Sequence, residues 1–228
     1  MTGFAGRRAA QARPNTLREG GTRDGSVRPA GSRQPGGYYN AQFQAHTLKV
    51  FLGHHLVSER SDVMMVTTLG SCVAACVHDP AAAIGGMNHF LLPEVPESED
   101  GGASAAARYG SVAMERLIND LLSRGARRDR LEVKLFGGAR VIDSSFDVGQ
   151  SNARFALDYV RREGLKLVGQ DLGGGSARRV HYFPNTGKAL RKLLRPEALS
   201  ETAHQELHFR STLRQQPIEG DVELFGED

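Results

Sequence analysis

The feature that most constrains the fold is a long apolar segment, residues 63–92, that is interrupted by two short turn signals. It contains VMMVTTLGSCVAACVHD, then a proline and three alanines, then IGGMNHFLL. Short apolar and β-branched runs bounded by Gly, Ser and Pro are typical of buried strands. We therefore expect a buried hairpin whose strands meet across the turn that follows Asp79-Pro80.

The pairing register of this hairpin decides which side chains share a face. If Val73–Asp79 pairs with Ile84–Leu91, the numbers of paired positions add up to about 163, or to 161 in a tighter register. Either odd sum places Cys72 and His89 on the same face, with Cβ atoms about 5 to 8 Å apart. A sum of 162 would place them on opposite faces.

Cys72 is the first candidate for chemistry. It follows Gly70-Ser71, where glycine permits a sharp turn that leaves backbone N–H groups available to bind an oxyanion. At the distance expected for His89, an imidazole can take the thiol proton and hold a thiolate at neutral pH. Two alternatives stay open from the residues alone, because free cysteine is often a small buried hydrophobe and a histidine in an apolar strand is often a core residue. Cys76 fits the buried interpretation.

A third group should fix the tautomer of the His89 imidazole. Thr67 and Thr68 lie on the preceding strand and are candidates, although β-branched residues are also ordinary strand formers. His181, in the segment VHYFP, is a further candidate that also suits a structural role.

Two glycine clusters, FGGAR and DLGGGSARR, match neither a P-loop nor a dinucleotide-binding fingerprint. We interpret them as tight turns around a cleft. Gln150 and Asn152 lie just inside an expected helix start, where they could hydrogen-bond a substrate amide; helix capping or solvent exposure would explain them equally well.

Two helices are expected from apolar periodicity. The first has Met114, Leu117, Ile118, Leu121 and Leu122 on one face and ends at Gly125. The second opens at Asp147 or Ser151 and stops at Gly164.

Strands are expected at residues 46–57, 131–136, 165–171 and 178–184, a surface loop at 95–104 and a short terminal helix at 190–194. Strands alternate with helices in the middle of the chain and pair as hairpins at both ends. The fold class is therefore α/β, with a mixed sheet and helices packed on it.

Charge is distributed unevenly along the chain, whose formal net charge is +3. Residues 1–40 hold seven arginines and two acidic residues, and they are rich in Gly, Pro and Ser. Such a segment cannot bury enough apolar surface to offset its chain entropy. We expect a disordered basic arm at 1–43, a folded domain at 44–198 and a loosely ordered acidic tail at 199–228. Nucleic-acid binding through the arm is the lowest-ranked alternative, and no nucleic-acid partner is predicted.

The remaining composition argues against several classes of protein. The two cysteines are four residues apart in an apolar segment and poorly placed to bridge each other, and no cluster of Cys and His has the spacing of metal ligands. No apolar run approaches the roughly 18 residues of a membrane helix, and no secretory signal is visible. We predict a cytoplasmic protein with no metal, no cofactor and no membrane insertion.

Six ordered blocks of the sequence together resemble the CheD family of chemoreceptor glutamine deamidases. They lie within about residues 46–195 and read TTLGSCVAACVHDP, IGGMNHFLLP, RYGSVAMERLINDLL, KLFGGAR, DVGQSNARFALDYVRREG and DLGGGSARRVHYFPNTGK. The resemblance implies a three-layer α/β sandwich similar to toxin-type deamidases. It also implies Cys72 as nucleophile, His89 as base and a threonine as third member, for which Thr67 is favoured over Thr68.

The function implied by the resemblance is deamidation of glutamines in the cytoplasmic region of methyl-accepting chemotaxis receptors, through a thioester and without a cofactor. Gly70 and Ser71 would supply the oxyanion site, and Gln150 would help to position the substrate. Receptor methyl-ester hydrolysis is implied as a side activity, and a CheC-type phosphatase as a partner. Two alternatives remain: another cysteine hydrolase, such as a small-molecule amidase or protease, and a non-catalytic chemotaxis adaptor.

Overall fold

The structure, a computed structural model, describes residues 37–92, 102–141, 147–195, 206, 208 and 209. Ten strands form two five-stranded sheets in this part of the chain. The first sheet has the order β1 (Tyr38–Asn40), β2 (Ala45–Lys49), β4 (Val63–Leu69), β9 (Arg178–Phe183) and β10 (Lys188–Leu193). The second has the order β3 (His55–Ser58), β6 (Ile84–Asn88), β5 (Val73–Asp79), β7 (Glu132–Gly137) and β8 (Lys166–Leu172).

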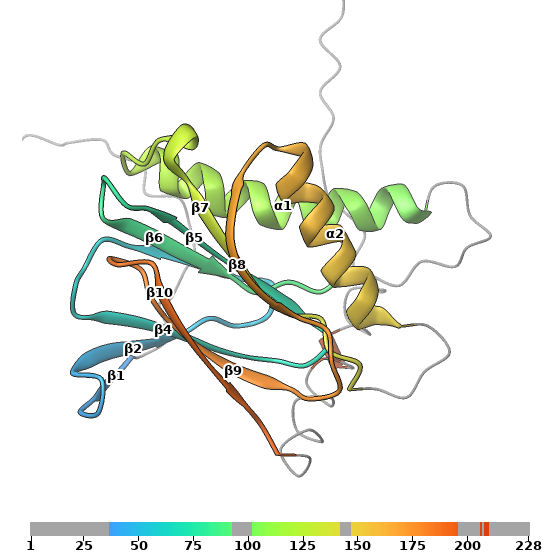
Figure 1. Ribbon diagram of the computed structural model, residues 1–228, viewed down its shortest axis with the longest axis horizontal. Coiled ribbons are helices and arrows are strands. Elements are labelled where there is room, and N and C mark those ends of the chain that lie inside the picture. The colour runs from blue at the N-terminus through green and yellow to red at the C-terminus, as the bar shows by residue number, and fades with distance from the viewer. Residues whose placement is uncertain (1–36, 93–101, 142–146, 196–205, 207, 210–228) are drawn as a thin grey trace, which may run out of the picture. The chain divides into compact units, whose positions relative to one another are not determined.

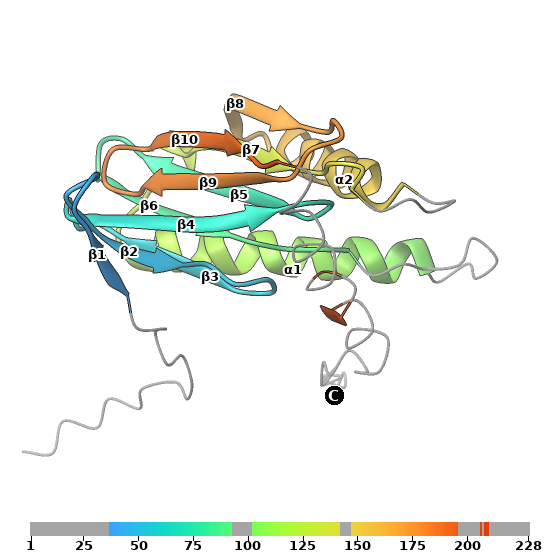
Figure 2. The ribbon, with the colours of Figure 1, turned by 90° about the horizontal axis from the view of Figure 1, so that it is seen from below.

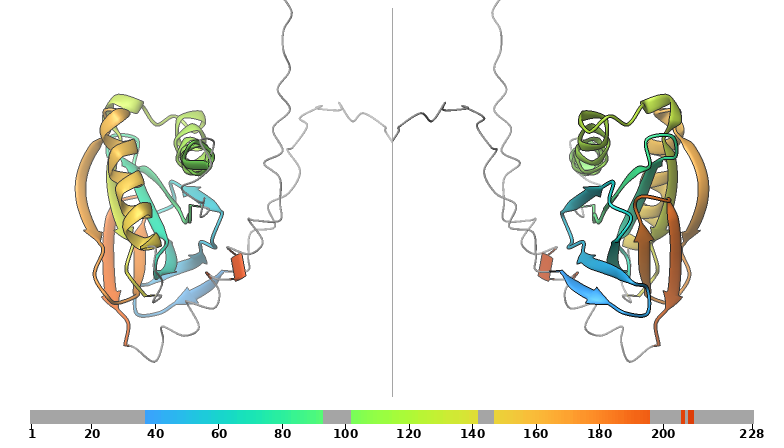
Figure 3. Two further views of the ribbon diagram at one scale, coloured as in Figure 1. Left: turned by 90° about the vertical axis from the view of Figure 1, so that its right-hand side faces the viewer. Right: turned by 90° about the vertical axis from the view of Figure 1, so that its left-hand side faces the viewer.

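Both sheets are mixed. The pairs β2–β4 and β7–β8 are parallel, and the other neighbours are antiparallel. Two helices, α1 (Gly102–Ser123) and α2 (Val148–Arg162), lie along one face of the second sheet, and the first sheet lies on its other face (Figures 1, 2 and 3). A short 3₁₀ helix, η1 (Arg128–Arg130), precedes β7.

The central strand β5 explains this layering, because all seven of its residues are buried. Val73, Ala75 and Val77 belong to the apolar cluster beneath the helices. Ala74 and Cys76, together with Cys72, belong to the cluster between the two sheets. The predicted α/β class with three layers is therefore confirmed, with the strands divided between two sheets where one mixed sheet was expected.

The hairpin β5–β6 has the register with a sum of 163. Cys76 pairs with Met87 and Val77 with Gly86, and an isolated bridge joins Val73 to Phe90. This odd-sum register is one of the two that place Cys72 and His89 on the same face.

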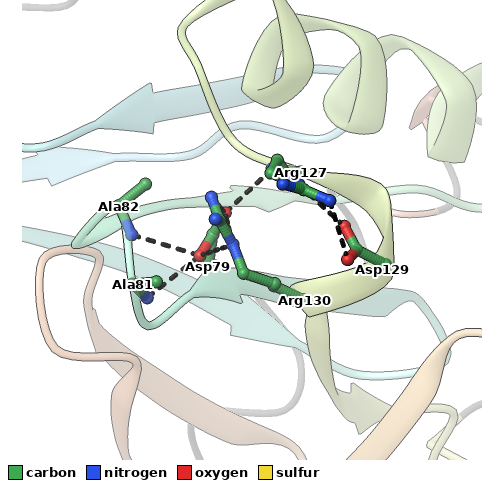
Figure 4. A network of polar contacts seen from close by, with 6 residues as sticks. All are labelled: Asp79, Ala81, Ala82, Arg127, Asp129 and Arg130. Carbon is green, nitrogen blue, oxygen red and sulfur yellow. Dashed lines mark hydrogen bonds and ion pairs between the residues drawn. The ribbon is translucent and has the colours of Figure 1, made fainter.

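A buried carboxylate holds the turn of this hairpin. Asp79 accepts backbone N–H bonds from Ala81, Ala82 and Arg127, and it forms an ion pair of 2.7 Å with Arg130 (Figure 4). Burial raises the pKa of Asp79, but these hydrogen bonds outweigh it and hold the pKa below its usual range. The turn is thereby fixed to η1.

Helix α1 ends, and helix α2 begins, where the sequence predicts. Four residues of the predicted α1 stripe are buried, namely Met114, Leu117, Ile118 and Leu121, and Gly125 follows the helix with φ of +95°. Asp147 caps α2 by accepting the N–H of Gln150 at 2.9 Å.

Four element predictions need correction. Residues 46–57 form two strands that lie in different sheets, β2 and β3, with Gly53 at φ of +82° between them. Residues 102–104, predicted as loop, lie in α1. Strand β1 begins at Tyr38, inside the segment predicted as the disordered arm. Residues 1–36 of that arm and most of the predicted acidic tail lie outside the described residues.

The fourth correction concerns residues 190–194, which were predicted to form a helix. Leu190 to Leu193 belong to β10, an edge strand that pairs with β9 along its whole length. The N–H groups of Thr186 and Gly187 donate to the Phe183 carbonyl and close the hairpin turn. Strand pairing overrides the helix propensity of Leu, Arg and Lys here.

Candidate active site

The candidate nucleophile, Cys72, is the last residue of the tight loop between β4 and β5 (residues 70–72, here called the nucleophile loop) and is fully buried. The FGGAR segment, which runs from the last two residues of β7 into the turn that follows, supports this loop. Gly138 donates its N–H to the Cys72 carbonyl at 2.7 Å, and Ala139 donates to the Gly70 carbonyl at 2.8 Å. Gly137 has φ of +115°, and a Cβ at this position would lie 2.0 Å from the Cys72 carbonyl oxygen. Glycine is therefore required where the two segments meet.

Asn152 ties the same loop to α2. Its Nδ2 donates to the Ser71 carbonyl at 2.9 Å, while its Oδ1 accepts the N–H of Leu92 at 2.8 Å. The side chain is fully buried, so Asn152 holds the nucleophile loop against the segment that follows β6. Gln150, one of the predicted substrate-positioning residues, is exposed on the first turn of the same helix.

His89 follows β6 and contacts Thr67 across the space between the sheets. The Thr67 Oγ1 lies 2.8 Å from Nδ1 of His89 and donates to the Val50 carbonyl at 2.9 Å. A hydroxyl has one proton, and a carbonyl can only accept. Thr67 therefore gives its proton to Val50 and accepts the N–H of His89 Nδ1.

This contact fixes the tautomer of the imidazole. In neutral His89 the proton lies on Nδ1, so Nε2 carries a lone pair. Nε2 is buried and has no hydrogen-bond partner among the residues that the structure describes. Burial lowers the pKa of His89 to about 4, against the opposing effect of the Glu206 charge. At neutral pH, Nε2 can thus act as a proton acceptor.

Glu206 is a site residue that the sequence did not reveal. Its carboxylate accepts N–H bonds from Gly70 at 2.9 Å, from Ser71 at 3.0 Å and from Cys72 at 3.4 Å. The Ser71 hydroxyl also donates to it, at 2.5 Å. The side chain is 3% exposed. The polar segment around Glu206 has no local signal of burial, which is why the sequence predicted a loosely ordered tail.

Glu206 also affects the thiol. Burial raises the pKa of Cys72 most, and the negative charge of Glu206 and a hydrogen bond with it raise this pKa further. With Glu206 in place, Cys72 and His89 are therefore both neutral at pH 7.

The other sequence candidates lie away from this pair. The Thr68 hydroxyl lies 3.5 Å from Arg179 Nε, and His181 packs against Phe43. Cys76 is buried between the sheets, and burial raises its pKa. The turn DLGGGSARR lines a cavity of about 460 Å³ together with Arg191, and neither Cys72 nor His89 lines it.

A smaller cavity, of about 40 Å³, adjoins His89. Its lining includes Gly53, Tyr109 and Arg116. Within the described ranges, no group of three or more His, Cys, Asp or Glu side chains could hold a metal ion. Over the same ranges, the search found no helix with the length and apolar character needed to cross a membrane.

The fold and the site define a class: a three-layer α/β protein with a candidate cysteine, histidine and threonine hydrolase site. The family model described as CheD chemotactic sensory transduction matches residues 91–193. The probable chemoreceptor glutamine deamidases CheD of Rhodopseudomonas palustris (strain BisA53) and Halorhodospira halophila (strain DSM 244 / SL1) are each 46% identical to the chain. Each alignment covers 82% of this chain and 88% of the relative. The chain belongs to the CheD family.

A solved structure also overlaps with the chain. The hypothetical protein YfiH of Bacillus licheniformis is 10% identical to it, with a TM-score of 0.32, over 51% of this chain and 49% of that protein. This overlap is too small to support an argument about the fold.

Proposed function

We propose that this chain is a protein-glutamine deamidase that converts glutamine side chains of methyl-accepting chemotaxis receptors to glutamate. Membership of the CheD family supports the reaction and the substrate, since the similar relatives bear the name chemoreceptor glutamine deamidase. The observation that carries the chemistry is the hydrogen bond between Thr67 and His89, because it leaves Nε2 of the imidazole as the proton acceptor. Receptor substrates imply a cytoplasmic location, which we include in the proposal.

The first step is attack by the Cys72 thiolate on the carbon of the glutamine carboxamide. Nε2 of His89 takes the thiol proton, and a C–S bond forms as the C=O bond becomes a C–O⁻ bond. The N–H groups of Gly70 and Cys72 converge on one oxygen of the Glu206 carboxylate and that of Ser71 on the other, and at this place they can hold the oxyanion.

The second step releases ammonia. The His89 imidazolium gives its proton to the leaving nitrogen, the C–N bond breaks, and a thioester remains on Cys72. Water then attacks the acyl carbon of the thioester as His89 takes one of its protons; a C–O bond forms, the C–S bond breaks, and the imidazolium gives that proton to the Cys72 sulfur. The substrate leaves as glutamate, and the reaction needs no cofactor.

Four finer assignments belong to the same proposal. Thr67, and not Thr68, orients His89. Gln150, exposed at the start of α2, contacts the receptor near the modified side chain. A glutamate methyl ester would form the same thioester, so receptor methylesterase activity is a second reaction of this site, and a CheC-type phosphatase is a partner.

A non-catalytic adaptor is the second candidate function. The observation that favours it is the Glu206 carboxylate, which occupies the N–H groups beside Cys72 while the thiol is buried and neutral. An adaptor would bind receptors while Glu206 stays on these N–H groups and the Cys72 thiol stays buried.

Intact-mass analysis and ammonia release from a receptor cytoplasmic fragment test the proposal. We expect a gain of about 1 Da per modified glutamine with the wild type and with Cys76→Ala, and none with Cys72→Ala or His89→Ala. Ammonia release that persists in Cys72→Ala would contradict the mechanism. Receptor binding without ammonia release by the wild type would favour the adaptor.

A further inference from the structure

The carboxylate of Glu206 occupies the place that the proposed mechanism reserves for the substrate. Its two oxygens accept the N–H groups of Gly70, Ser71 and Cys72 and the Ser71 hydroxyl. These are the donors that would bind the oxygen of a glutamine carboxamide. A loop that presents several N–H groups in one direction binds an anion or an oxyanion.

A second contact anchors the same stretch of chain. Residues 206, 208 and 209 are helical, and Phe209 packs against the apolar cluster between the sheets, with its ring beside Gly53. Side chains three residues apart lie on one face of a helical turn. Glu206 and Phe209 therefore attach this turn at the nucleophile loop and at Gly53, which lines the cavity that adjoins His89.

The chemistry of Glu206 matches that of the reaction. Glutamate is the product of glutamine deamidation, and its side chain has the length and shape of the substrate side chain. A glutamate held in cis with its carboxylate on the oxyanion N–H groups is a product analogue tethered to the enzyme.

We infer that Glu206 is an autoinhibitory ligand in cis: its carboxylate fills the carboxamide subsite, and a receptor glutamine must displace it to reach Cys72. The inference rests on the proposed function for the identity of the displaced substrate. It predicts that the resting enzyme protects its nucleophile, and that losing the Glu206 contact exposes a reactive thiol.

A purely structural role for Glu206 makes a different prediction. If the carboxylate only holds the nucleophile loop in shape, its removal would loosen the loop or the domain without selective activation of Cys72. Cys76 is an internal control, because it is buried between the sheets and becomes reactive when they separate.

The test measures alkylation of both cysteines by iodoacetamide at pH 8 in the full-length chain, with each site quantified by peptide mass spectrometry. For Glu206→Ala we expect Cys72 to react roughly tenfold faster or more, since thiol reactivity follows thiolate fraction and access, while Cys76 stays slow. Phe209→Ala should accelerate Cys72 in the same direction, because it weakens the second anchor. Glu59→Ala removes an exposed carboxylate outside the site and should match the wild type.

Unchanged Cys72 alkylation in Glu206→Ala would overturn the inference, and so would parallel acceleration at Cys72 and Cys76. If Glu206→Ala does not fold, the alkylation rates of Cys72 and Cys76 in folded Phe209→Ala decide instead. Unchanged Cys72 alkylation, or parallel acceleration of both cysteines, would again overturn the inference. Alkylation needs no receptor, so this outcome is separate from that of the proposed function. Absence of ammonia release would count against the deamidase, whereas the alkylation rates would still decide whether Glu206 covers Cys72.

Discussion

At the scale of single residues, the candidate site depends on where two protons lie. Thr67 gives its only proton to Val50 and so requires the His89 proton on Nδ1. The Cys72 thiol keeps its proton because burial and the Glu206 carboxylate both raise its pKa. In the proposed mechanism, a thiolate forms when the carboxylate leaves and His89 Nε2 receives the proton, which would couple substrate entry to activation of the thiol.

Thr67→Val tests the orienting role of the hydroxyl. We expect kcat for receptor deamidation to fall roughly 10- to 100-fold with little change in KM, because the imidazole loses the group that fixes its tautomer. Nδ1–H would lose the Thr67 hydroxyl and keep only the Val50 carbonyl as acceptor, so we also expect the free energy of unfolding to fall by about 1 kcal/mol. Ammonia-release kinetics and urea denaturation measure the two effects.

Two matched variants accompany this measurement. Thr67→Ser keeps the hydroxyl and should retain most of kcat. Thr68→Val makes the same chemical change beside Arg179 and should leave kcat unchanged. A Thr68→Val variant as impaired as Thr67→Val would contradict the assignment.

The sequence predicted part of this site. The odd-sum register pointed to Cys72 and His89 on one face because the alternation of a strand is a local property. The strand pattern alone could not decide between Thr67 and Thr68, since that choice depends on which face of β4 meets the second sheet; only the family resemblance favoured Thr67. Glu206 reaches the site from a distant polar segment, and local patterns carry no information about such a contact.

At the scale of elements, the nucleophile loop takes its shape from neighbours that are distant in sequence. Helix α2 holds it through Asn152, and the turn after β7 holds it through two backbone hydrogen bonds. The sequence predicted α2 and the tight turn, but not what they support, because the Asn152 amide pairs with backbone groups from two other segments.

Asn152→Ala measures the contribution of α2. It removes two buried hydrogen bonds and leaves the Ser71 carbonyl and the Leu92 N–H without their partner. We expect a loss of about 2 to 4 kcal/mol in urea denaturation and a fall in kcat of roughly tenfold through displacement of the loop. Asn119→Ala, an identical change at an exposed position of α1, should alter neither quantity by much; equal effects of the two variants would refute the role of Asn152.

Gly137→Ala tests the close approach between the end of β7 and the nucleophile loop. Its Cβ would clash with the Cys72 carbonyl, so we expect a loss of about 3 kcal/mol or more and loss of most deamidase activity. Gly125 also has positive φ, but nothing lies within 4 Å of a Cβ there. Gly125→Ala should therefore cost only about 1 kcal/mol and keep full activity. Thermal unfolding and ammonia release compare the two, and similar losses in both variants would show that backbone strain alone matters.

At the scale of the whole described domain, the site is assembled by packing of the two sheets. The first sheet provides Thr67, and the hairpin of the second sheet leads into Cys72 and His89. The buried Tyr182 of β9 also joins the sheets by donating its hydroxyl proton to the Val77 carbonyl at 2.8 Å. The sequence predicted strands and helices but one sheet in place of two, because a strand buried on both faces reads the same whether a helix or a second sheet covers it.

The stability of the domain should therefore depend on pH through the buried His89. Its pKa in the folded state is about 4, below the ordinary value of 6.5, so the unfolded chain binds more protons between these two pH values. The contribution of neutral His89 to unfolding free energy is fully present above about pH 6.5. It is lost as pH falls toward 4, by up to about 3 kcal/mol. The lowered pKa of Asp79 also makes unfolding free energy fall with pH, but in a lower pH range. Its stabilising contribution is lost as pH falls below the ordinary carboxyl range.

Urea denaturation at pH 7, 5.5 and 4.5 separates these effects. The wild type should lose unfolding free energy steadily across this range, and His89→Gln should lose much less, since glutamine does not titrate. Burial also lowers the pKa values of His55 and His181, but both are half-buried, so His181→Gln should keep most of the wild-type slope. If His89→Gln and the wild type had the same slope, the imidazole would not be neutral and buried in the folded state, and its assignment as the proton acceptor for Cys72 would lose its physical basis.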